Sequence, residues 1–206
     1  MKIGIIGSGM IGGTLARLFA NAGHDVFVSN SRGPHSLKDL EVTLGPRVTA
    51  LTPEEAAAHG DVVVLALPWR NRRELPGAKL FERKIVVDAT NPYKPDGGVH
   101  DLGDSTSSEE IAKLMPGARV VKAFNTMHYK TLAREGKKSK DGRLAIFVAG
   151  DDEQAKQIVG KLIEDIGFTP VDTGSLHEGG RKQEPDSPIY NKPMAVDEAR
   201  KNLARV

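Results

Sequence analysis

The chain has 206 residues, of which 39% are hydrophobic and 27% are charged, and its formal net charge is +2. A chain of this length buries about 70% of the surface that its unfolded form exposes, so we expect one domain with a proper core. The small net charge gives no argument for a nucleic-acid partner. Because the sequence has no cysteine, thiol catalysis, disulfides and cysteine-based metal sites are excluded.

The sequence carries no sign of targeting to or through a membrane. No apolar run approaches the ~20 residues that a membrane-spanning helix needs. The residues after Met1 already read as a core strand, which is not the pattern of a secretory signal. We therefore expect a cytoplasmic protein that does not insert into a membrane.

The first thirty residues carry the pattern of a dinucleotide-binding fold. Lys2–Ile6 reads as a buried strand, and apolar residues recur at helical spacing up to Gly23. In this context the first glycine of the intervening turn permits a tight bend, the second lets a pyrophosphate approach the backbone, and the third lets the helix pack closely. The alternative is a glycine-rich turn in an ordinary α/β protein. We predict that a pyrophosphate binds to Gly7-Ser8-Gly9-Met10-Ile11-Gly12, where the helix N-terminus offers free N–H groups.

Asp25-Val26-Phe27-Val28 reads as the second strand, and its end distinguishes NADP from NAD. In an NAD-binding protein this strand usually ends in Asp or Glu, which holds the ribose 2′-hydroxyl. Here no carboxylate occurs from residue 27 to residue 37. Two charge-assisted hydrogen bonds of about 1.5–3 kcal/mol each would favour NADP by roughly 10²- to 10⁴-fold. We predict that the 2′-phosphate is bound by Ser29-Asn30-Ser31-Arg32; a solvated polar loop is the alternative.

Strands and helices alternate along the rest of the chain. Strand patterns occur at residues 48–50, 61–67, 84–89, 119–124, 144–149 and 168–171. Helix patterns run from Thr52 with a capping box, through Met115 with Ser107-Ser108-Glu109-Glu110 as the cap, from 151 to 166 and from Ala195. Continuous apolar runs are typical of parallel strands covered on both faces. We predict an α/β Rossmann fold: a doubly wound, mostly parallel sheet with helices on both faces. Residues 1–173 would form the NADP-binding domain (core 1–150), and residues 174–206 a small C-terminal extension packed on the same domain.

Three loops follow strands and should lie beside the cofactor, because ligands of open α/β sheets bind at the carboxyl ends of the strands. The predicted contacts are Leu67-Pro68-Trp69 after the fourth strand and Asn91-Pro92 after the fifth. A packing role is an equal alternative for Trp69, and a role in the turn is an equal alternative for Asn91.

The loop after the sixth strand holds Asn125 and His128, which are the candidate catalytic residues. A structural or surface role is the alternative for His128. The sequence shows no nucleophile–base pair and no metal-ligand cluster, so we expect no metal. Hydride transfer between two redox cofactors needs mainly that the protein hold two rings face to face.

A basic run occupies residues 129–143, with Lys130, Arg134, Lys137, Lys138, Lys140 and Arg143. Such a run is usually a solvated face. The alternative is a binding surface for an anionic partner or for the anionic tail of a substrate, and the sequence leaves this open.

Several segments resemble the NADP oxidoreductases that depend on the deazaflavin coenzyme F420. They are residues 7–13, 29–34, 67–69, 88–92, 120–126, 149–152 and 174–176. The resemblance implies a dinucleotide-binding fold, often in a homodimer, that binds NADP(H) and passes hydride between the nicotinamide and the deazaflavin.

One segment departs from that pattern, because the sixth strand ends in Lys-Ala-Phe-Asn-Thr at residues 122–126. This version is also similar to the cytosolic NADPH domains of membrane ferric reductases, which pass hydride to a flavin. Three functions therefore stay open: a deazaflavin-linked hydride transferase, an NADPH-dependent flavin or ferric-chelate reductase, and a non-catalytic NADP-binding module. The sequence fixes neither the electron acceptor nor the direction of transfer.

Overall fold

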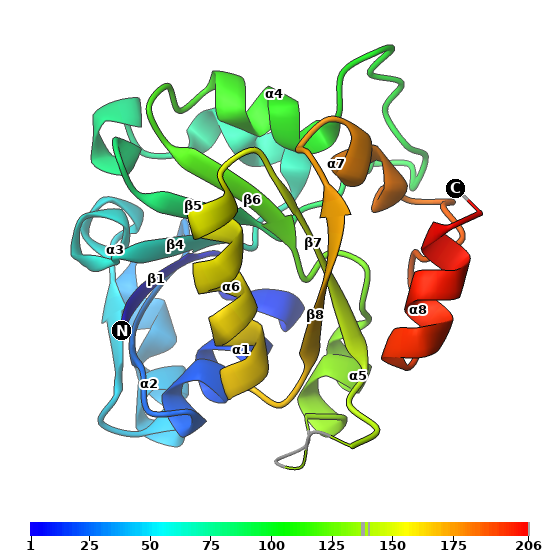
Figure 1. Ribbon diagram of the computed structural model, residues 1–206. Coiled ribbons are helices and arrows are strands. Elements are labelled where there is room, and N and C mark those ends of the chain that lie inside the picture. The colour runs from blue at the N-terminus through cyan, green and yellow to red at the C-terminus, as the bar shows by residue number, and fades with distance from the viewer. Residues whose placement is uncertain (137–138, 140, 206) are drawn as a thin grey trace.

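The computed structural model describes residues 1–136, 139 and 141–205, and its strands form one eight-stranded sheet in the order β3-β2-β1-β4-β5-β6-β7-β8. Neighbouring strands are parallel except β6 and β7, which are antiparallel. The predicted mostly parallel Rossmann sheet is thus confirmed (Figure 1). The strands are β1 (Lys2–Ile6), β2 (Asp25–Ser29), β3 (Val48–Leu51), β4 (Val62–Leu65), β5 (Ile85–Asp88), β6 (Arg119–Ala123), β7 (Ala145–Gly150) and β8 (Thr169–Gly174).

The strand order reverses between β1 and β4. From β1 the chain adds β2 and then β3 on one side, and from β4 it adds β5 and then β6 on the other. Ile3 of β1 is in register with Val26 of β2 and with Val62 of β4. Ligands of doubly wound sheets bind outside the carboxyl ends of the strands at this reversal, so the fold places the site beside the loops that follow β1, β2, β4, β5 and β6.

Helices cover both faces of the sheet (Figure 1). The α-helices are α1 (Met10–Asn21), α2 (Lys38–Leu44), α3 (Pro53–His59), α4 (Ser107–Lys113), α5 (Tyr129–Arg134), α6 (Glu153–Asp165), α7 (Glu178–Lys182) and α8 (Val196–Leu203). Three short 3₁₀ helices are η1 (Pro34–Leu37), η2 (Trp69–Glu74) and η3 (Ala78–Phe81).

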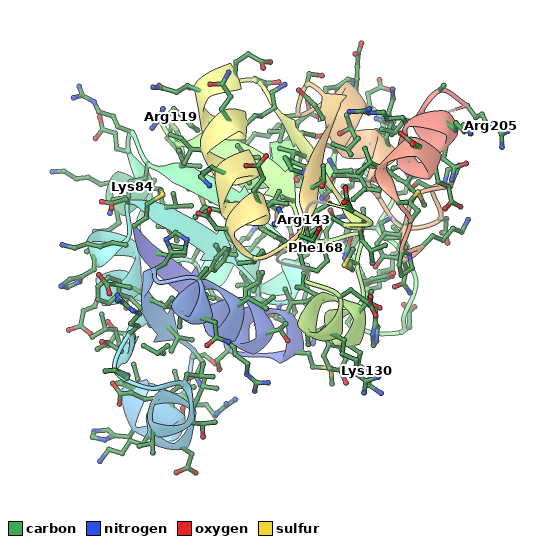
Figure 2. All side chains as sticks on the ribbon, turned by 60° about the horizontal axis from the view of Figure 1, so that its bottom comes forward. Lys84, Arg119, Lys130, Arg143, Phe168 and Arg205 are labelled. Carbon is green, nitrogen blue, oxygen red and sulfur yellow. The ribbon has the colours of Figure 1, made fainter. Side chains whose placement is uncertain are left out.

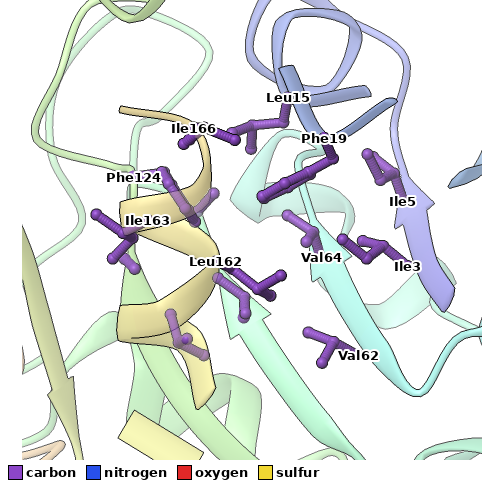
Figure 3. Close-up of a cluster of buried hydrophobic side chains, with 14 of the residues drawn as sticks. Ile3, Ile5, Leu15, Phe19, Val62, Val64, Phe124, Leu162, Ile163 and Ile166 are labelled. Carbon is purple, nitrogen blue, oxygen red and sulfur yellow. The ribbon is translucent and has the colours of Figure 1, made fainter. Parts of the chain in front are cut away.

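The larger core lies between the sheet and helices α1 and α6. Figure 3 shows Ile3, Ile5 and Val64 of the central strands facing Phe19 of α1 and Leu162 of α6. All of these side chains are fully or almost fully buried. Apolar burial contributes about 25 cal/mol per Å², so this layer is the main support of the two strands that flank the site.

The opposite face has its own core beneath α3, α4, η2 and η3. Trp69 of η2, Phe81 of η3 and Ile111 of α4 pack there against the other side of the central strands. The alternation of inward and outward side chains along a strand explains this division. Ile3 and Ile5 belong to the first core, whereas Ile6 belongs to the second.

Two helices begin with a capping box. In α3, Thr52 accepts a hydrogen bond from the Glu55 N–H, and the Glu55 carboxylate accepts one from Thr52 N–H, as the sequence predicts. In α4 the prediction is wrong by one residue. Its cap is Thr106, paired with Glu109, rather than Ser107. The Thr106 hydroxyl lies three residues before a glutamate, which is the spacing that a capping box needs.

The C-terminal segment packs against the last two strands. Ile189, Met194 and Ala199 form a third apolar cluster with Phe147 of β7 and Val171 of β8. Leu144 forms an antiparallel bridge with Ala195. Among the described residues, no helix is both long enough and apolar enough to span a bilayer.

Candidate functional site

The glycine-rich turn between β1 and α1 is held by close backbone packing. Gly7 has φ +108°, and a Cβ there would lie 2.3 Å from the Ala66 carbonyl oxygen. A Cβ on Gly12 would lie 1.8 Å from the Gly7 carbonyl oxygen. Both positions therefore exclude a side chain. A Cβ on Gly9, in contrast, would meet no atom within 4 Å, so the backbone at the start of α1 is open to a ligand.

A cavity of about 250 Å³ lies beside this turn, and we call it the adenosine-side cavity. It joins the glycine turn to the end of β2 and to the loop that follows β4. Its lining includes Gly7, Ser8, Gly9, Asn30, Ser31, Arg32, Leu67 and Pro68. Eight residues of the predicted cofactor site thus lie together around one cavity.

Asn30 organises the polar end of the adenosine-side cavity. Its Nδ2 donates to the hydroxyls of Ser8 (3.2 Å) and Ser36 (2.9 Å), and its Oδ1 accepts from the Arg32 N–H (2.8 Å). Ser31 and Arg32 themselves are exposed. Since Asn30 ties the loop down, their hydroxyl and guanidinium are available to an anion.

Ser29 is placed differently from its neighbours. Its hydroxyl is buried and donates to the Ile5 carbonyl oxygen at 3.0 Å. That bond joins β2 to β1 and directs the hydroxyl into the sheet. Ser36, which the sequence analysis did not select, lies instead on the solvent side of Asn30, and its hydroxyl reaches Asn30 Oδ1 at 3.1 Å.

A second cavity of about 280 Å³ lies on the other side of the glycine turn, and we call it the ring-side cavity. It is formed by the start of α1, by the loops after β5 and β6, and by the C-terminal segment. Its lining is Met10, Ile11, Ala89, Asn91, Asn125, Met127, His128, Tyr129, Tyr190 and Asn191. The predicted residues Met10, Ile11, Asn91, Asn125 and His128 therefore come together here.

A network of amides fixes the floor of the ring-side cavity. Asn91 Nδ2 donates to the Asn125 carbonyl oxygen (3.2 Å), which orients Asn91 so that its Oδ1 accepts from Asn125 Nδ2 (3.0 Å). Asn125 Nδ2 also donates to the Gln183 carbonyl oxygen at 2.7 Å. Because backbone carbonyls can only accept, the orientation of both amides is determined. Asn125 Oδ1 is buried and has no partner among the described residues.

Phe124 makes the bend that leads from β6 into this network. It has φ +68° although it is not glycine, a conformation that costs about 1–3 kcal/mol and persists only where the surroundings enforce it. Its ring is 1% exposed and packs edge-on against Phe19, with the centroids 6.2 Å apart. The core thus holds the strained bend that positions Asn125.

His128 lies at the rim of the ring-side cavity and begins α5. Its Nδ1 accepts a hydrogen bond from the Lys130 N–H at 3.3 Å. An imidazole that accepts at Nδ1 carries its proton at Nε2 when it is neutral. The ring is exposed and lies 4.6 Å from the ring of Tyr129, so its Nε2–H is free to reach a ligand.

Tyr190 lines the same cavity and is paired with Tyr93, from a distant part of the chain. The hydroxyls of Tyr93 and Tyr190 share a hydrogen bond of 3.0 Å. Burial, with the hydrogen bond to Tyr93 as a further contribution, raises the pKa of the Tyr190 phenol. The phenol therefore stays protonated at neutral pH. Nothing in the local sequence marks Tyr190 or Asn191 as part of the site, because they reach it only through the path of the C-terminal segment.

Trp69 and Pro92 are placed in the protein interior. Trp69 is 2% exposed, its indole N–H donates to the Ser107 carbonyl oxygen at 3.0 Å, and the Arg72 guanidinium lies 3.5 Å above its ring. Pro92 is buried, and its carbonyl oxygen accepts from the His100 N–H at 2.8 Å. Neither residue lines the adenosine-side or the ring-side cavity, so packing is the role that the structure gives them.

A buried ion pair supports the loops from below. Lys122 Nζ lies 3.8 Å from Asp88 Oδ2, and both side chains are fully buried. Lys122 also donates to the hydroxyls of Ser107 (2.9 Å) and Ser108 (3.1 Å), and Asp88 accepts from the Thr90 N–H (3.0 Å). The pair joins the ends of β5 and β6 to α4, and the sequence analysis missed it because a lysine inside an apolar strand gives no local signal of its partner.

The basic run at 129–143 is only partly within the described residues. Lys130 and Arg134 lie on α5 with their side chains exposed. Arg143 donates to the Glu164 carbonyl oxygen at 3.1 Å. Lys137, Lys138 and Lys140 lie outside the described residues.

A glycine turn open to a phosphate, a carboxylate-free end of β2 and a second cavity at the sheet reversal define the class: an NADP-dependent oxidoreductase on a Rossmann fold. Residues 2–92 match the family model described as NADP oxidoreductase, coenzyme F420-dependent. The solved hypothetical protein SMa0349 of Sinorhizobium meliloti is 35% identical, covers 96% of both chains and has a TM-score of 0.84. Over residues 2–92 the chain is thus similar to the family of F420-dependent NADP oxidoreductases.

Two curated relatives point to different electron acceptors. The chain is 33% identical over 176 residues to metalloreductase STEAP3 of Rattus norvegicus, and the matched region covers 85% of this chain and 34% of that protein. It is 28% identical over 155 residues to the F420-dependent NADP reductase of Methanocaldococcus jannaschii, and that matched region covers 64% of this chain and 61% of that protein. The chain thus spans about a third of the length of the metalloreductase.

Proposed function

We propose that this protein transfers hydride between NADP(H) and the deazaflavin coenzyme F420. The observation that carries the proposal is the pair of cavities on the two sides of the glycine turn, one lined by Gly9 and the other by the next residue, Met10. The adenosine-side cavity offers the exposed Ser31 and Arg32 to a 2′-phosphate, and the ring-side cavity offers apolar and amide groups to a nicotinamide. A dinucleotide that crosses the glycine turn would place its adenosine half in the first cavity and its nicotinamide half in the second.

The bound rings supply the redox chemistry: one hydride, with its two electrons, passes from the reduced nicotinamide to the acceptor ring, and the acceptor takes one proton. The protein's own residues orient the rings and supply the proton. Met10 and Ile11 would contact the nicotinamide. We propose His128, on the rim of the same cavity, as the proton donor: in its imidazolium form it would give its Nε2 proton to the acceptor ring and be left as neutral imidazole.

We propose a positioning role for Asn125 in place of direct catalysis. Both of its amide hydrogens are bound within the protein, and its Oδ1 is buried. Asn125 thus acts through Asn91, which lines the cavity, and through the C-terminal segment at Gln183. The homodimer implied by the resemblance stays a prediction.

The test is NADPH oxidation by the purified protein with F420 as acceptor, alongside assays with FMN and with NADH. NADPH-specific turnover with the deazaflavin supports the proposal. His128→Gln, which keeps a side chain that can cap α5, should lower kcat at least tenfold while KM for NADPH stays the same. Full activity in that variant would remove His128 from the mechanism.

A flavin or ferric-chelate reductase is the second candidate. It is favoured by the 33% identity to a metalloreductase across most of this chain, against 28% to the F420-dependent reductase. Turnover with FMN and none with F420 would establish this alternative. Binding of NADPH without turnover on either acceptor would leave a non-catalytic NADP-binding module.

A further inference from the structure

A third cavity of about 420 Å³ runs along the outer side of α1, between that helix and α5. We call it the α1–α5 groove. Arg17 of α1 and Lys130 and Arg134 of α5 line it, and all three side chains are exposed. Figure 2 shows Lys130 reaching outward from the end of α5. Ser8, Gly9 and Met10 of the proposed dinucleotide site line one end of the groove, but the dinucleotide site does not account for the three cations.

Within the part of the chain that the structure describes, no carboxylate is paired with any of these three cations. Among the described residues, none of the ion pairs involves Arg17, Lys130 or Arg134. Like charges that face one groove repel each other, and an anion between them relieves that repulsion. The groove therefore has the electrostatic character of an anion site with room for an extended ligand.

The groove opens directly into the ring-side cavity. Met10 and Tyr129 line both spaces, and the Met10 side chain at their junction is 68% exposed. A molecule whose ring lies in the ring-side cavity could thus continue into the groove past Met10.

The distance along α1 separates the groove from the pyrophosphate site. Arg17 follows Met10 by seven residues, which is about 10 Å along the axis of an α-helix. A pyrophosphate on Gly9 would lie at the top of the groove and would not extend that far, and Asn30, Ser31 and Arg32 of the predicted 2′-phosphate site line the adenosine-side cavity and not the groove. A second anion is therefore needed to reach Arg17.

We propose that the α1–α5 groove binds the anionic chain of the hydride acceptor, a phosphate- or carboxylate-bearing tail attached to the ring that enters the ring-side cavity. This inference rests on the proposed function, since it concerns the second co-substrate of the same site. It makes the charge of the tail, as well as the ring, a determinant of which acceptor the protein uses.

Two pairs of ligands test the inference on the wild-type protein with NADP⁺ bound. FMN and riboflavin share a ring and differ by a phosphate, and F420 and its deazaflavin chromophore differ by the anionic chain. Binding is measured by equilibrium titration at low and high salt. Within any pair that binds, we expect the affinity of the charged ligand to exceed that of the uncharged ligand about tenfold or more. This difference in affinity should shrink at high salt because exposed charges are screened. Equal affinities within both pairs, or no binding of either pair, would overturn the proposal.

Variants locate the effect. Arg17→Gln and Arg134→Gln should each weaken binding of the charged ligand about three- to tenfold and leave the uncharged ligand unchanged. Arg205→Gln is the matched control, because Arg205 lies at the C-terminal helix, away from α5 (Figure 2). NADP⁺ affinity should not move in any of the three. If it fell together with that of the charged ligand, the groove would serve the dinucleotide and the proposal would fail.

These titrations separate the inference from the proposed function. Turnover plays no part in them, so a protein that binds FMN more tightly than riboflavin through Arg17 supports the groove even where F420 is not reduced. Conversely, turnover with F420 and with its tail-less chromophore at equal KM supports the proposed function and overturns the groove.

Discussion

The two cavities of the site are built in opposite ways. The polar end of the adenosine-side cavity comes from one stretch of chain, in which Asn30 bonds to Ser8 and Ser36, 22 and 6 residues away. The ring-side cavity joins Asn125 to Asn91 across 34 residues and Tyr93 to Tyr190 across 97. The first is a local motif on a strand–turn–helix unit, and the second exists only once the whole sheet and the C-terminal segment are in place.

The residues of the two cavities also differ in how deeply they are buried. Ser31 and Arg32 are exposed, whereas Asn125 is 5% exposed and bound on two sides. A substitution on the adenosine side should therefore change ligand binding and leave folding intact. A substitution in the ring-side network should change stability as well, because a buried group without its partner costs free energy.

Gly9→Val gives the largest effect that we expect. The added side chain would enter the space where the pyrophosphate approaches the turn, so the affinity for NADPH and NADH should fall about 100-fold or more. Because a Cβ at Gly9 meets no atom within 4 Å, the midpoint of urea unfolding should hardly move. Retained dinucleotide affinity would remove the glycine turn from the site.

Arg32→Asp should change the choice of cofactor. It replaces an attractive charge by a repulsive one beside the 2′-phosphate, so NADPH binding should weaken by about 3 kcal/mol, or about 100-fold, while NADH gains relative to it. Dissociation constants for both cofactors, measured in parallel, check this. Ser29→Ala is a useful comparison: its hydroxyl bonds to Ile5, so this variant should lose stability and keep its cofactor preference.

Asn125→Ala should show that residues of the two cavities contribute differently to stability. It leaves the Gln183 carbonyl and Asn91 Oδ1 without a donor, which should lower the free energy of unfolding by about 1–3 kcal/mol. Ser31→Ala is the matched change on the adenosine side and should leave that free energy unchanged. We expect Asn125→Ala also to lower kcat while KM for NADPH stays near its normal value. Equal stability of the two variants would contradict the contrast between the cavities.

The contrast also explains what the sequence could predict. The fingerprint at 7–12 and the loop at 29–32 are short-range patterns with a physical meaning of their own. Eight of those ten residues line one of the two cavities, and the other two are the turn glycine Gly12 and the buried Ser29. The roles of Trp69, Gln183 and Tyr190 depend on long-range packing. No local pattern shows that the Trp69 indole meets the Ser107 carbonyl or that the chain after α7 returns to the end of β6.

The two capping boxes also differ in whether their contacts are local or long-range. In α3, the Glu55 carboxylate accepts hydrogen bonds from the N–H and the hydroxyl of Thr52, and these bonds lower its pKa. In α4, burial opposes ionisation of Glu109, but hydrogen bonds from His177 and Thr106 outweigh it and lower the pKa. His177 lies 68 residues away, beside α7, with Nδ1 3.0 Å from Glu109 Oε2.

Both carboxylates have folded-state pKa values below the usual 4.5, so the unfolded chain binds more protons near that pH. Their stabilisation is therefore fully present above pH 4.5 and is lost as the pH falls through the lowered folded-state values. Glu109→Gln should lose more stability at pH 7 than Glu55→Gln, because it also weakens the contact that holds α7 and the segment leading to Gln183. It should also reduce the loss of stability between pH 6 and pH 3 more than Glu55→Gln does. Urea unfolding of both variants at these pH values measures the difference, and equal responses would mean that the long-range contact of Glu109 adds nothing to its local cap.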